Sequence, residues 1–309
     1  MKNILVTGGL GFIGYNFVKY LLANNLCQKI INVDKIDYCS NKPDIEDKRY
    51  KFIHTDISKS IYEIKNYLED YEIDTIFHFA AETHVDNSYR NPEIFINTNI
   101  TGTYYLLEAT RLYGKIKTFF HISTDEVYGD HKLFSEFDAL EPTNPYSASK
   151  AGAEMFVKAY YHSYNIPYKM IRMNNIFGPN QYSDKLIPKT IKLFKSGQKM
   201  TIHGKGEIYR NFLHVNDAIR GILIIYEKGE YGNTYNIGSK NKVKIIDLIK
   251  KIYELIHGSI ENFDHNIIYI DDRPHNDAAY DLDFNKIIEL GWKEKEDFQQ
   301  KLEELINNF

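Results

Sequence analysis

The chain has 309 residues, of which 43% are hydrophobic and 26% charged, and its formal net charge is −4. This balance is typical of a globular protein and offers no basic field to nucleic acid or an anionic membrane. The two cysteines, Cys27 and Cys39, are too few for a disulfide scaffold, and no metal-type cysteine spacing is present. Because no apolar run reaches about 18 residues, the sequence predicts no membrane span, and we expect a cytoplasmic protein.

The first half of the chain alternates short strands with longer helical patterns. We expect strands at 3–7, 30–34, 51–54, 75–79, 118–123 and 168–173, and helices at 12–24, 61–69, 91–112 and 146–164. Near-continuous apolar strands separated by helices predict an α/β fold of the Rossmann type, with a doubly wound parallel sheet covered on both faces. Ligands of such sheets bind at the carboxyl ends of the strands.

After about residue 174, glycine and proline divide the chain into shorter elements. Helical patterns remain at 185–196, 215–227, 245–256 and 301–308. We therefore predict a Rossmann domain at 1–173 and a smaller α/β substrate lobe at 174–309, with some interchange of chain between them. Since no linker separates the two, we expect them to share one cleft.

A glycine-rich loop, Gly8-Gly-Leu-Gly11-Phe-Ile-Gly14, follows the first strand and opens the first helix. Its glycines let backbone N–H groups approach a pyrophosphate at the helix N-terminus. Asp34 ends the second strand, where its carboxylate can accept hydrogen bonds from the adenosine ribose and would repel a 2′-phosphate. We therefore predict bound NAD in preference to NADP, although the neighbouring Lys35 weakens that preference.

The ends of the third and fourth strands carry weaker indications of the same cofactor. Asp56 and Ile57 could contact an adenine ring, and the small residues of Phe79-Ala80-Ala81 would let a cofactor pass close to the backbone. Each of these features is also compatible with ordinary packing.

Tyr146 and Lys150 lie four residues apart, hence on one face of a helix whose first turn suits Pro145. A nearby ammonium favours the phenolate and lowers the tyrosine pKa, which would make Tyr146 a general base. Thr124 could hydrogen-bond the same substrate oxygen. The spacing alone is weak in a chain with 25 tyrosines, but the glycine loop and the strand order strengthen it.

Two acids, Asp125 and Glu126, directly follow Thr124 where a strand ends. Adjacent acids more often form a solvated turn. Two carboxyl groups in different environments can, however, have their pKa values pushed apart, so that one serves as an acid and the other as a base. Hydride transfer alone does not need them, so they predict a coupled proton-shuttling step such as loss of water.

Together these motifs resemble the extended short-chain dehydrogenase/reductase family, and within it the nucleotide-sugar 4,6-dehydratases, over about residues 2–309. Thr124-Asp-Glu-Val-Tyr-Gly129 is the dehydratase form of its segment, whereas related 4-epimerases usually carry Ser-Ala-x-Val-Tyr-Gly. Residues 34–40, 83–88, 174–181, 185–188 and 273–277 are similar to the dehydratase domain of plant UDP-rhamnose synthases and related giant-virus enzymes. Asn87 stands where bacterial dTDP-glucose dehydratases usually have arginine, which favours UDP-glucose.

The resemblance implies conversion of UDP-glucose to UDP-4-keto-6-deoxyglucose, with tightly held NAD oxidising C4 transiently. Tyr146 would take the C4 hydroxyl proton, helped by Thr124 and Lys150. Glu126 would remove the C5 proton, and Asp125 would protonate the departing C6 hydroxyl. Further implied cofactor contacts are Phe12, Ile13, Asp37, Ser40, Thr83, Thr98 and Ser123. Implied substrate contacts are Thr83, Asn175, Lys185, Leu186, Thr201, His203, Arg210, Asn236, Arg273 and Asn276, with no metal.

Three alternatives stay open on the sequence. The substrate could be dTDP-glucose, the reaction could be that of a UDP-sugar 4-epimerase or decarboxylase, or the chain could bind NAD without catalysis. The resemblance also implies a homodimer, in which the helices at 91–112 and 146–164 pair into a four-helix bundle.

Overall fold

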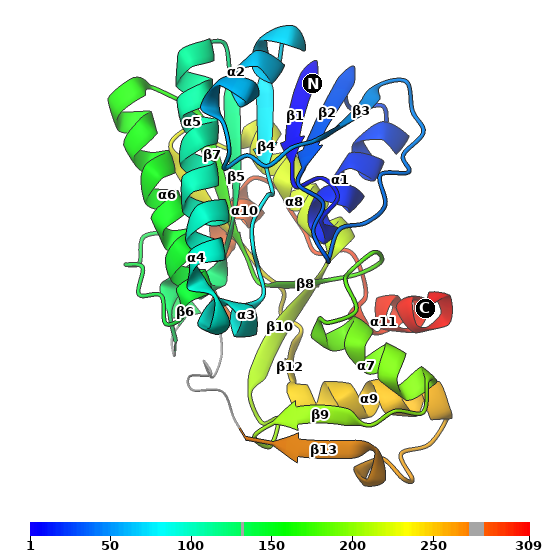
Figure 1. The fold of residues 1–309 in the computed structure, drawn as a ribbon. Coiled ribbons are helices and arrows are strands. Elements are labelled where there is room, and N and C mark those ends of the chain that lie inside the picture. Colours follow the sequence, from blue (N-terminus) through cyan, green and yellow to red (C-terminus); the bar gives the residue numbers. More distant parts are fainter. Residues whose placement is uncertain (131–132, 272–280) are drawn as a thin grey trace.

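The main layer of the molecule is a seven-stranded parallel sheet with the order β11-β7-β5-β4-β1-β2-β3 (Figure 1). The computed structural model describes residues 1–130, 133–271 and 281–309. The strands of this sheet are β1 (Asn3–Thr7), β2 (Lys29–Asp34), β3 (Tyr50–His54), β4 (Thr75–His78), β5 (Thr118–Thr124), β7 (Tyr168–Met173) and β11 (Asn233–Ile237). The order runs outward from β1 in both directions, so the predicted doubly wound sheet is confirmed.

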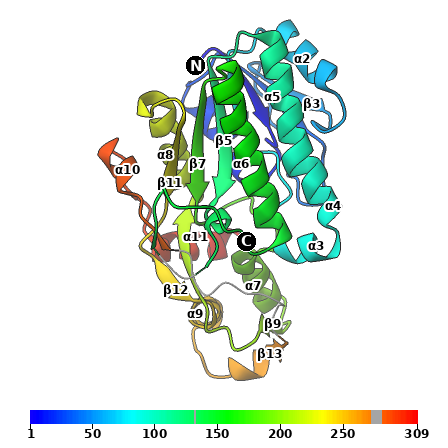
Figure 2. The same cartoon turned by 90° about the vertical axis from the view of Figure 1, so that its left-hand side faces the viewer.

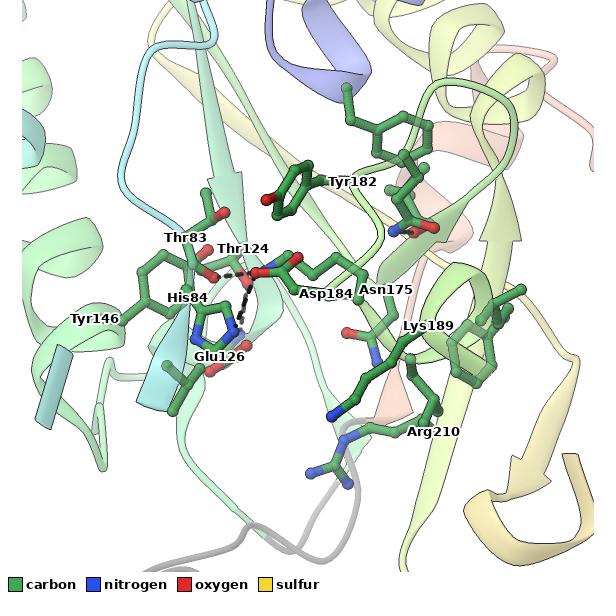
Figure 3. Close-up of a pocket in the computed structure, with 18 of the residues that line it drawn as sticks. Thr83, His84, Thr124, Glu126, Tyr146, Asn175, Tyr182, Asp184, Lys189 and Arg210 are labelled. Carbon is green, nitrogen blue, oxygen red and sulfur yellow. Dashed lines mark hydrogen bonds and ion pairs between the residues drawn. The ribbon is translucent and has the colours of Figure 1, made fainter. Parts of the chain in front are cut away.

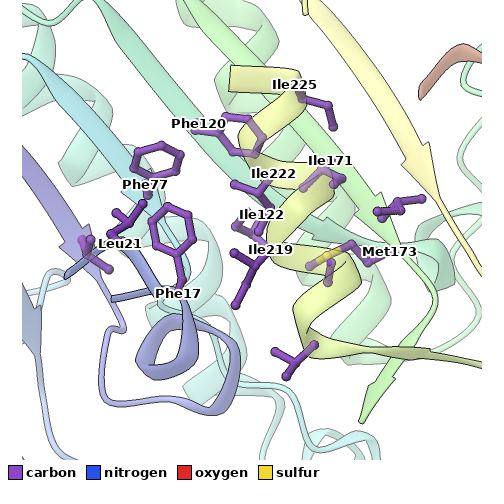
Figure 4. Packing of buried hydrophobic residues seen from close by; sticks show 14 of the residues in the cluster. Phe17, Leu21, Phe77, Phe120, Ile122, Ile171, Met173, Ile219, Ile222 and Ile225 are labelled. Atoms are coloured by element: carbon purple, nitrogen blue, oxygen red, sulfur yellow. The ribbon is translucent and has the colours of Figure 1, made fainter. Parts of the chain in front are cut away.

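Helices cover both faces of this sheet (Figures 1 and 2). They are α1 (Phe12–Ala23), α8 (Val215–Lys228), α2 (Ile61–Asp70), α5 (Gly102–Tyr113) and α6 (Pro145–Tyr164). The first two pack on one face, where Phe17 and Ile222 meet Phe77 and Phe120 of the sheet (Figure 4), and the other three cover the opposite face. Strands buried on both faces lack a polar alternation, which is why their sequences read as apolar runs. None of the described helices combines the length and apolar character that a bilayer crossing requires.

The helix expected at 91–112 consists of three successive segments, so the prediction of one α-helix is wrong in this detail. These segments are α4 (Pro92–Phe95), a π-helical turn η1 (Ile96–Thr101) and α5. In the π turn, buried Asn99 accepts a hydrogen bond from the N–H of Glu82 at 2.8 Å and donates one to Ser149 at 2.8 Å. A π turn inserts an extra residue and often lies near a functional site. Here it aims Asn99 at the loop that follows β4.

A smaller lobe follows β7 and lies beyond the carboxyl ends of the main strands, in the lower part of Figure 1. It contains a three-stranded sheet in the order β12-β10-β8, a parallel strand pair and three helices. Its elements are β8 (Asn175–Phe177), α7 (Leu186–Lys195), β9 (Met200–His203), β10 (Tyr209–His214), β12 (Lys242–Lys244), α9 (Ile245–His257), β13 (Ile267–Ile270) and α11 (Phe298–Asn308). Phe194, Ile249 and Leu302 belong to its separate hydrophobic core.

The chain returns to the main sheet more than once after residue 174. Strand β11 pairs in parallel with β7, α8 packs against α1, and the short helix α10 (Asn285–Glu289) contacts β11. A cut at residue 173 would therefore remove one strand and its covering helices from the main layer. The remaining short elements are α3 (Val85–Arg90), η2 (Asp125–Tyr128), β6 (Leu133–Phe134), η3 (Asp264–Asn266) and β14 (Asp281–Leu282).

Candidate active site

A cavity of about 620 Å³ lies between the carboxyl ends of the main strands and the smaller lobe (Figure 3). Many of the residues singled out from the sequence line it. They are Gly8, Gly11, Phe12, Ile13, Gly14, Phe79, Ala81, Thr83, Ser123, Thr124, Glu126, Tyr146, Lys150, Asn175, Lys185, Leu186, Thr201, His203 and Arg210. Both lobes therefore contribute to one site.

The glycine loop is packed too closely for side chains. Gly8 has a φ of 70°, and a Cβ on it would lie 2.6 Å from the Cα of Ala80. A Cβ on Gly14 would lie 2.4 Å from the carbonyl oxygen of Gly8. Helix α1 begins after Gly11 without a side-chain cap, so the N-terminus of this helix faces the cavity as a dinucleotide pyrophosphate requires.

Asp34 lies at the end of β2 beside this loop, and its carboxylate is already engaged. It accepts hydrogen bonds from the N–H groups of Leu10 and Ile36, each at 2.9 Å. Burial raises the pKa of this carboxyl, while those two backbone donors oppose the rise. Lys35 turns its ammonium to Glu82, and Asp37 lies 3.5 Å from the same nitrogen. The positive charge beside Asp34 is therefore balanced within the protein.

Several predicted cofactor residues do not line the cavity. Ile57 is buried in the core against Gly102, and Asp56 caps its own turn by accepting from the N–H of Ser58 at 2.9 Å. Thr98 is buried and accepts a hydrogen bond from Lys35 at 3.3 Å. The others outside the lining are Asp34, Lys35, Asp37, Ser40 and Ala80, which lie around the glycine loop or next to it.

Tyr146 and Lys150 both lie on α6 and reach the cavity, but their electrostatics differ from the prediction. Burial raises the pKa of Tyr146 well above its ordinary value, with a further rise from Glu126. Burial also lowers the pKa of Lys150 to about 8, and its Nζ donates a hydrogen bond to the carbonyl of Ile122 at 2.7 Å. The pKa of Tyr146 is thus raised and not lowered as expected, because desolvation is the largest effect at both groups.

Thr124, Asp125 and Glu126 mark the change from β5 to the turn η2. Thr124 caps this turn by accepting from the N–H of Glu126 at 3.3 Å. Glu126 lines the cavity and accepts from Asn144 Nδ2 at 3.2 Å. Asp125 lies outside the lining and is only 2% exposed. Burial, and then the charge of Glu126, raise the pKa of Asp125 to about 7. The two acids thus occupy different environments.

Among the predicted substrate residues, Asn236 lies elsewhere. It is fully buried in β11, where its side chain accepts from the Tyr128 hydroxyl at 2.7 Å and donates to the carbonyls of Phe134 and Asp283. These bonds satisfy the amide within the protein and join β11 to the β6 region, so Asn236 holds the fold together and does not contact the cavity. Arg273 and Asn276 lie outside the described residues.

Other cavity residues were not assigned from the sequence. His84 Nε2 lies 3.2 Å from Asp184 Oδ2 (Figure 3). Beside this pair, Lys185, which the sequence did suggest, donates to the carbonyl of Thr83 at 3.1 Å. These contacts join the loop after β4 to the segment before α7, one from each lobe. Asn144 and Asn174 also line the cavity and contact the two acids. The sequence offered only the neighbouring motifs as a signal for them.

The parallel sheet, the glycine loop and the buried Tyr146–Lys150 pair together define an extended short-chain dehydrogenase/reductase. Residues 5–305 match the family described as GDP-mannose 4,6 dehydratase, and the chain belongs to this family. The resemblance stated from the motifs is thereby confirmed.

Known relatives are similar over nearly the whole chain. A trifunctional UDP-glucose 4,6-dehydratase/UDP-4-keto-6-deoxy-D-glucose 3,5-epimerase/UDP-4-keto-L-rhamnose-reductase of Arabidopsis thaliana is 43% identical, over 99% of this chain and 46% of that protein. The chain thus spans about half the length of this plant relative. The dTDP-D-glucose 4,6-dehydratase of Bos taurus is 39% identical, over 99% of this chain and 88% of that protein. The crystal structure of a Streptomyces venezuelae dTDP-glucose 4,6-dehydratase, with NAD and TYD bound, superposes with a TM-score of 0.93 at 32% identity, covering 99% and 96% of the two chains.

Proposed function

We propose that this chain is an NAD-dependent nucleotide-sugar 4,6-dehydratase that converts UDP-glucose to UDP-4-keto-6-deoxyglucose and water. The observation that carries the proposal is the grouping at one cavity of Tyr146 and Lys150 with the acidic pair. Oxidation and reduction alone would need the first two residues. Glu126 facing the cavity, and Asp125 buried behind it with a raised pKa, add the base and the acid that elimination of water needs.

NAD fits the glycine loop and the end of β2. Gly8 has no side chain and packs closely against Ala80, so the backbone of the loop is open to a pyrophosphate. The start of α1 has no side-chain cap and supplies N–H groups and a favourable dipole. The carboxylate of Asp34 and the paired charge of Lys35 favour a ribose with free hydroxyls over one with a 2′-phosphate. Bound there, NAD would supply the hydride chemistry of the reaction, as acceptor of the C4 hydrogen and donor to C6.

The residues of the chain handle the protons of the reaction. Tyr146 takes the proton of the C4 hydroxyl, while Thr124 hydrogen-bonds the same oxygen. Tyr146 must be a phenolate before this step, and the ammonium of Lys150 on the same helix favours that form. Once C4 is a ketone, the C5 proton is acidic, and Glu126 removes it. Asp125 then gives its proton to the C6 oxygen, which leaves as water, and Glu126 returns its proton to C5. Tyr146 now holds the C4 hydroxyl proton and Asp125 has lost its own, so the release of one proton by Tyr146 and the uptake of one by Asp125 reset the site.

Basic and polar groups of the smaller lobe suit the diphosphate and the base. Arg210 has the planar guanidinium that binds phosphate oxygens in pairs, and Lys185 adds a second cation to the cavity lining. Thr201 and His203 of β9 line the same cavity, where a base could be contacted.

The choice of UDP-glucose over dTDP-glucose rests on the similarity to the plant relatives and on Asn87. This asparagine lies outside the cavity lining and donates to the Tyr38 hydroxyl at 3.4 Å. Uracil and thymine differ by one methyl group, which an apolar pocket distinguishes by only about 1–3 kcal/mol. A comparison of kcat/KM for UDP-glucose and dTDP-glucose will show which of the two substrates the enzyme prefers.

The decisive test of the activity is incubation of the purified protein with UDP-glucose or dTDP-glucose and no added cofactor. We expect a 4-keto-6-deoxy sugar nucleotide and NAD released on denaturation, identified by mass spectrometry. A C4 epimer or a decarboxylated sugar as the product would replace dehydration by one of the alternative reactions. If neither substrate is converted although NAD is recovered, the chain is a cofactor-binding protein without this activity.

We further propose a homodimer formed through α5 and α6. Large apolar side chains stay exposed on these helices and on the segment before α5. They are Ile94, Ile96, Leu112, Met155, Phe156 and Tyr164. A second copy would bury this surface by pairing the helices into a four-helix bundle.

We also place the enzyme in the cytoplasm. Cys27 and Cys39 are both free thiols, and burial raises the pKa of each, which keeps them protonated and unreactive in a reducing compartment.

A further inference from the structure

Asn174 lies where the chain leaves the main sheet for the smaller lobe, between β7 and β8. Its side chain is buried, and its Nδ2 donates a hydrogen bond to Asp125 Oδ2 at 2.7 Å. No role was assigned to this residue from the sequence. It touches the acid of the proposed reaction from the side opposite to Thr124, whose hydroxyl donates to Oδ1 at 3.1 Å.

The orientation of the Asn174 amide is set by a backbone group. The N–H of Ser239 donates to Asn174 Oδ1 at 3.3 Å, and the N–H of Asn174 itself donates to the carbonyl of Ile237 at 3.2 Å. A backbone N–H can only donate, so the amide oxygen must face Ser239 and the amide nitrogen must face Asp125. Gly238 makes room for this arrangement, since a Cβ there would lie 2.3 Å from Asn174 Oδ1.

We propose that Asn174 is a positioning residue that holds Asp125 in place and sets the pH range in which this carboxyl can give up its proton. The inference rests on the proposed dehydration. Because the amide cannot turn, Asp125 always meets a donor at Oδ2. A fixed donor stabilises the ionised carboxylate, and so it helps the proton to leave.

Other groups around Asp125 act in both directions. Burial and the negative charge of Glu126 favour the protonated carboxyl, as does any phenolate that forms on Tyr146. Arg210 and the Thr124 hydroxyl favour the ionised carboxylate together with Asn174. Without the Asn174 donor, Asp125 would keep its proton to higher pH and would lose one of its two side-chain anchors.

The test compares Asn174→Ala and the isosteric Asn174→Asp with the wild type. Asp at this position can still accept from the Ser239 N–H, but it turns an oxygen towards Asp125. A carboxyl that acts as an acid loses activity as pH rises through its pKa. We expect the pH at which the dehydration rate falls on the alkaline side to rise by about one pH unit or more in Asn174→Ala, and further in Asn174→Asp, with KM little changed.

Ser239→Ala is the matched control, because it keeps the N–H that orients the amide and should leave the pH of this fall in rate unchanged.

A second readout does not depend on turnover. Infrared difference spectra against pH, with Asp125→Asn subtracted, report the protonation of the Asp125 carboxyl itself. Its titration should rise in the order wild type, Asn174→Ala, Asn174→Asp. An unchanged or lowered titration in folded Asn174→Asp overturns the proposal, even if the rate falls. If the wild type makes no 4-keto-6-deoxy product, the proposed function fails, and the infrared titration still decides whether Asn174 controls Asp125.

Discussion

Asp125 is a carboxyl group that the fold keeps in an unfavourable environment. It is almost fully buried and lies next to a second acid, and together these effects raise its pKa to about 7. Near neutral pH it therefore holds its proton much of the time, as an acid that must protonate a leaving hydroxyl has to do. Glu126 faces the cavity and can act as the base. The proposed roles of the two adjacent carboxyl groups, one as acid and one as base, are based on their different surroundings.

Replacing either acid should stop water loss without removing the cofactor. In Glu126→Gln and Asp125→Asn we expect the dehydration rate to fall by about 100-fold to 10,000-fold, because general acid or base catalysis is lost. NAD recovered from the denatured protein should stay at the wild-type level. Full dehydration rates in both variants would show that the roles of these residues are assigned wrongly.

The same carboxyl should cost stability at neutral pH. In the unfolded chain Asp125 releases its proton near its ordinary pKa of 3.8, whereas in the folded chain it does so only near pH 7. Folding stability therefore falls as pH rises between these values and is constant above them. Asparagine has no proton to lose, so Asp125→Asn should be the more stable protein at pH 8, by at most about 4 kcal/mol, with a gap that closes towards pH 4. Urea unfolding of both proteins at pH 4 and pH 8 measures this difference in the free energy of unfolding. A difference that is equal at the two pH values would contradict the shifted pKa.

At the scale of elements, the site depends on how α6 begins. Asn144 caps this helix in a capping box, since its side chain accepts from the N–H of Ser147 at 2.9 Å while the Ser147 hydroxyl meets the N–H of Asn144. The same side chain donates to Glu126 through its nitrogen. One residue thus fixes both the start of the helix that carries Tyr146 and the orientation of Glu126, the proposed base.

These two roles can be separated by substitution. Asn144→Ala should lose about 0.5–2 kcal/mol of stability with the cap, whereas Asn144→Ser keeps a capping oxygen and should lose little. Neither side chain can donate to Glu126 across that distance, so both variants should lose activity. Denaturant unfolding and dehydration rates measure the two effects, and an Asn144→Ser enzyme with unchanged rate would rule out the link to Glu126.

The sequence was sufficient to locate six of the seven strands of the main sheet, because strands buried on both faces form apolar runs between longer helices. It did not predict β11. Thr234 and Asn236 interrupt that strand with polar side chains, and the structure satisfies them through distant partners such as Tyr128. The π turn η1 was missed for a similar reason, since the contact of Asn99 with Glu82 exists only after the chain has folded.

The candidate site was predictable where its residues end strands or belong to short motifs, as with Thr124 and the glycine loop. It was not predictable where a role depends on tertiary contact. Asn174 and His84 lie within segments that were noticed, but their partners Asp125 and Asp184 are 49 and 100 residues away. Likewise, the sequence suggested that Lys150 lowers the pKa of Tyr146, because spacing does not reveal how strongly both groups are buried.

At the scale of the whole molecule, the proposed dimer surface lies on the outer side of α5 and α6, away from the cavity. Introducing charge there should separate the subunits and leave the fold intact. We expect Met155→Glu and Phe156→Glu to give monomers in size-exclusion chromatography with light scattering. The matched control is Tyr269→Glu on β13, another exposed large side chain in the other lobe, which should not change the mass. A monomeric wild type would contradict the proposed dimer.

The return of β11, α8 and α10 to the main layer means that the lobes are joined by several crossings of the chain. Neither lobe is a contiguous segment that could be excised or transplanted through one junction. Recombination between relatives with different sugar nucleotides would have to exchange a set of separate segments at once, each with matching ends. Asn174 and Ser239 lie at two of these crossings, so a chimaera joined there would also disturb the setting of Asp125.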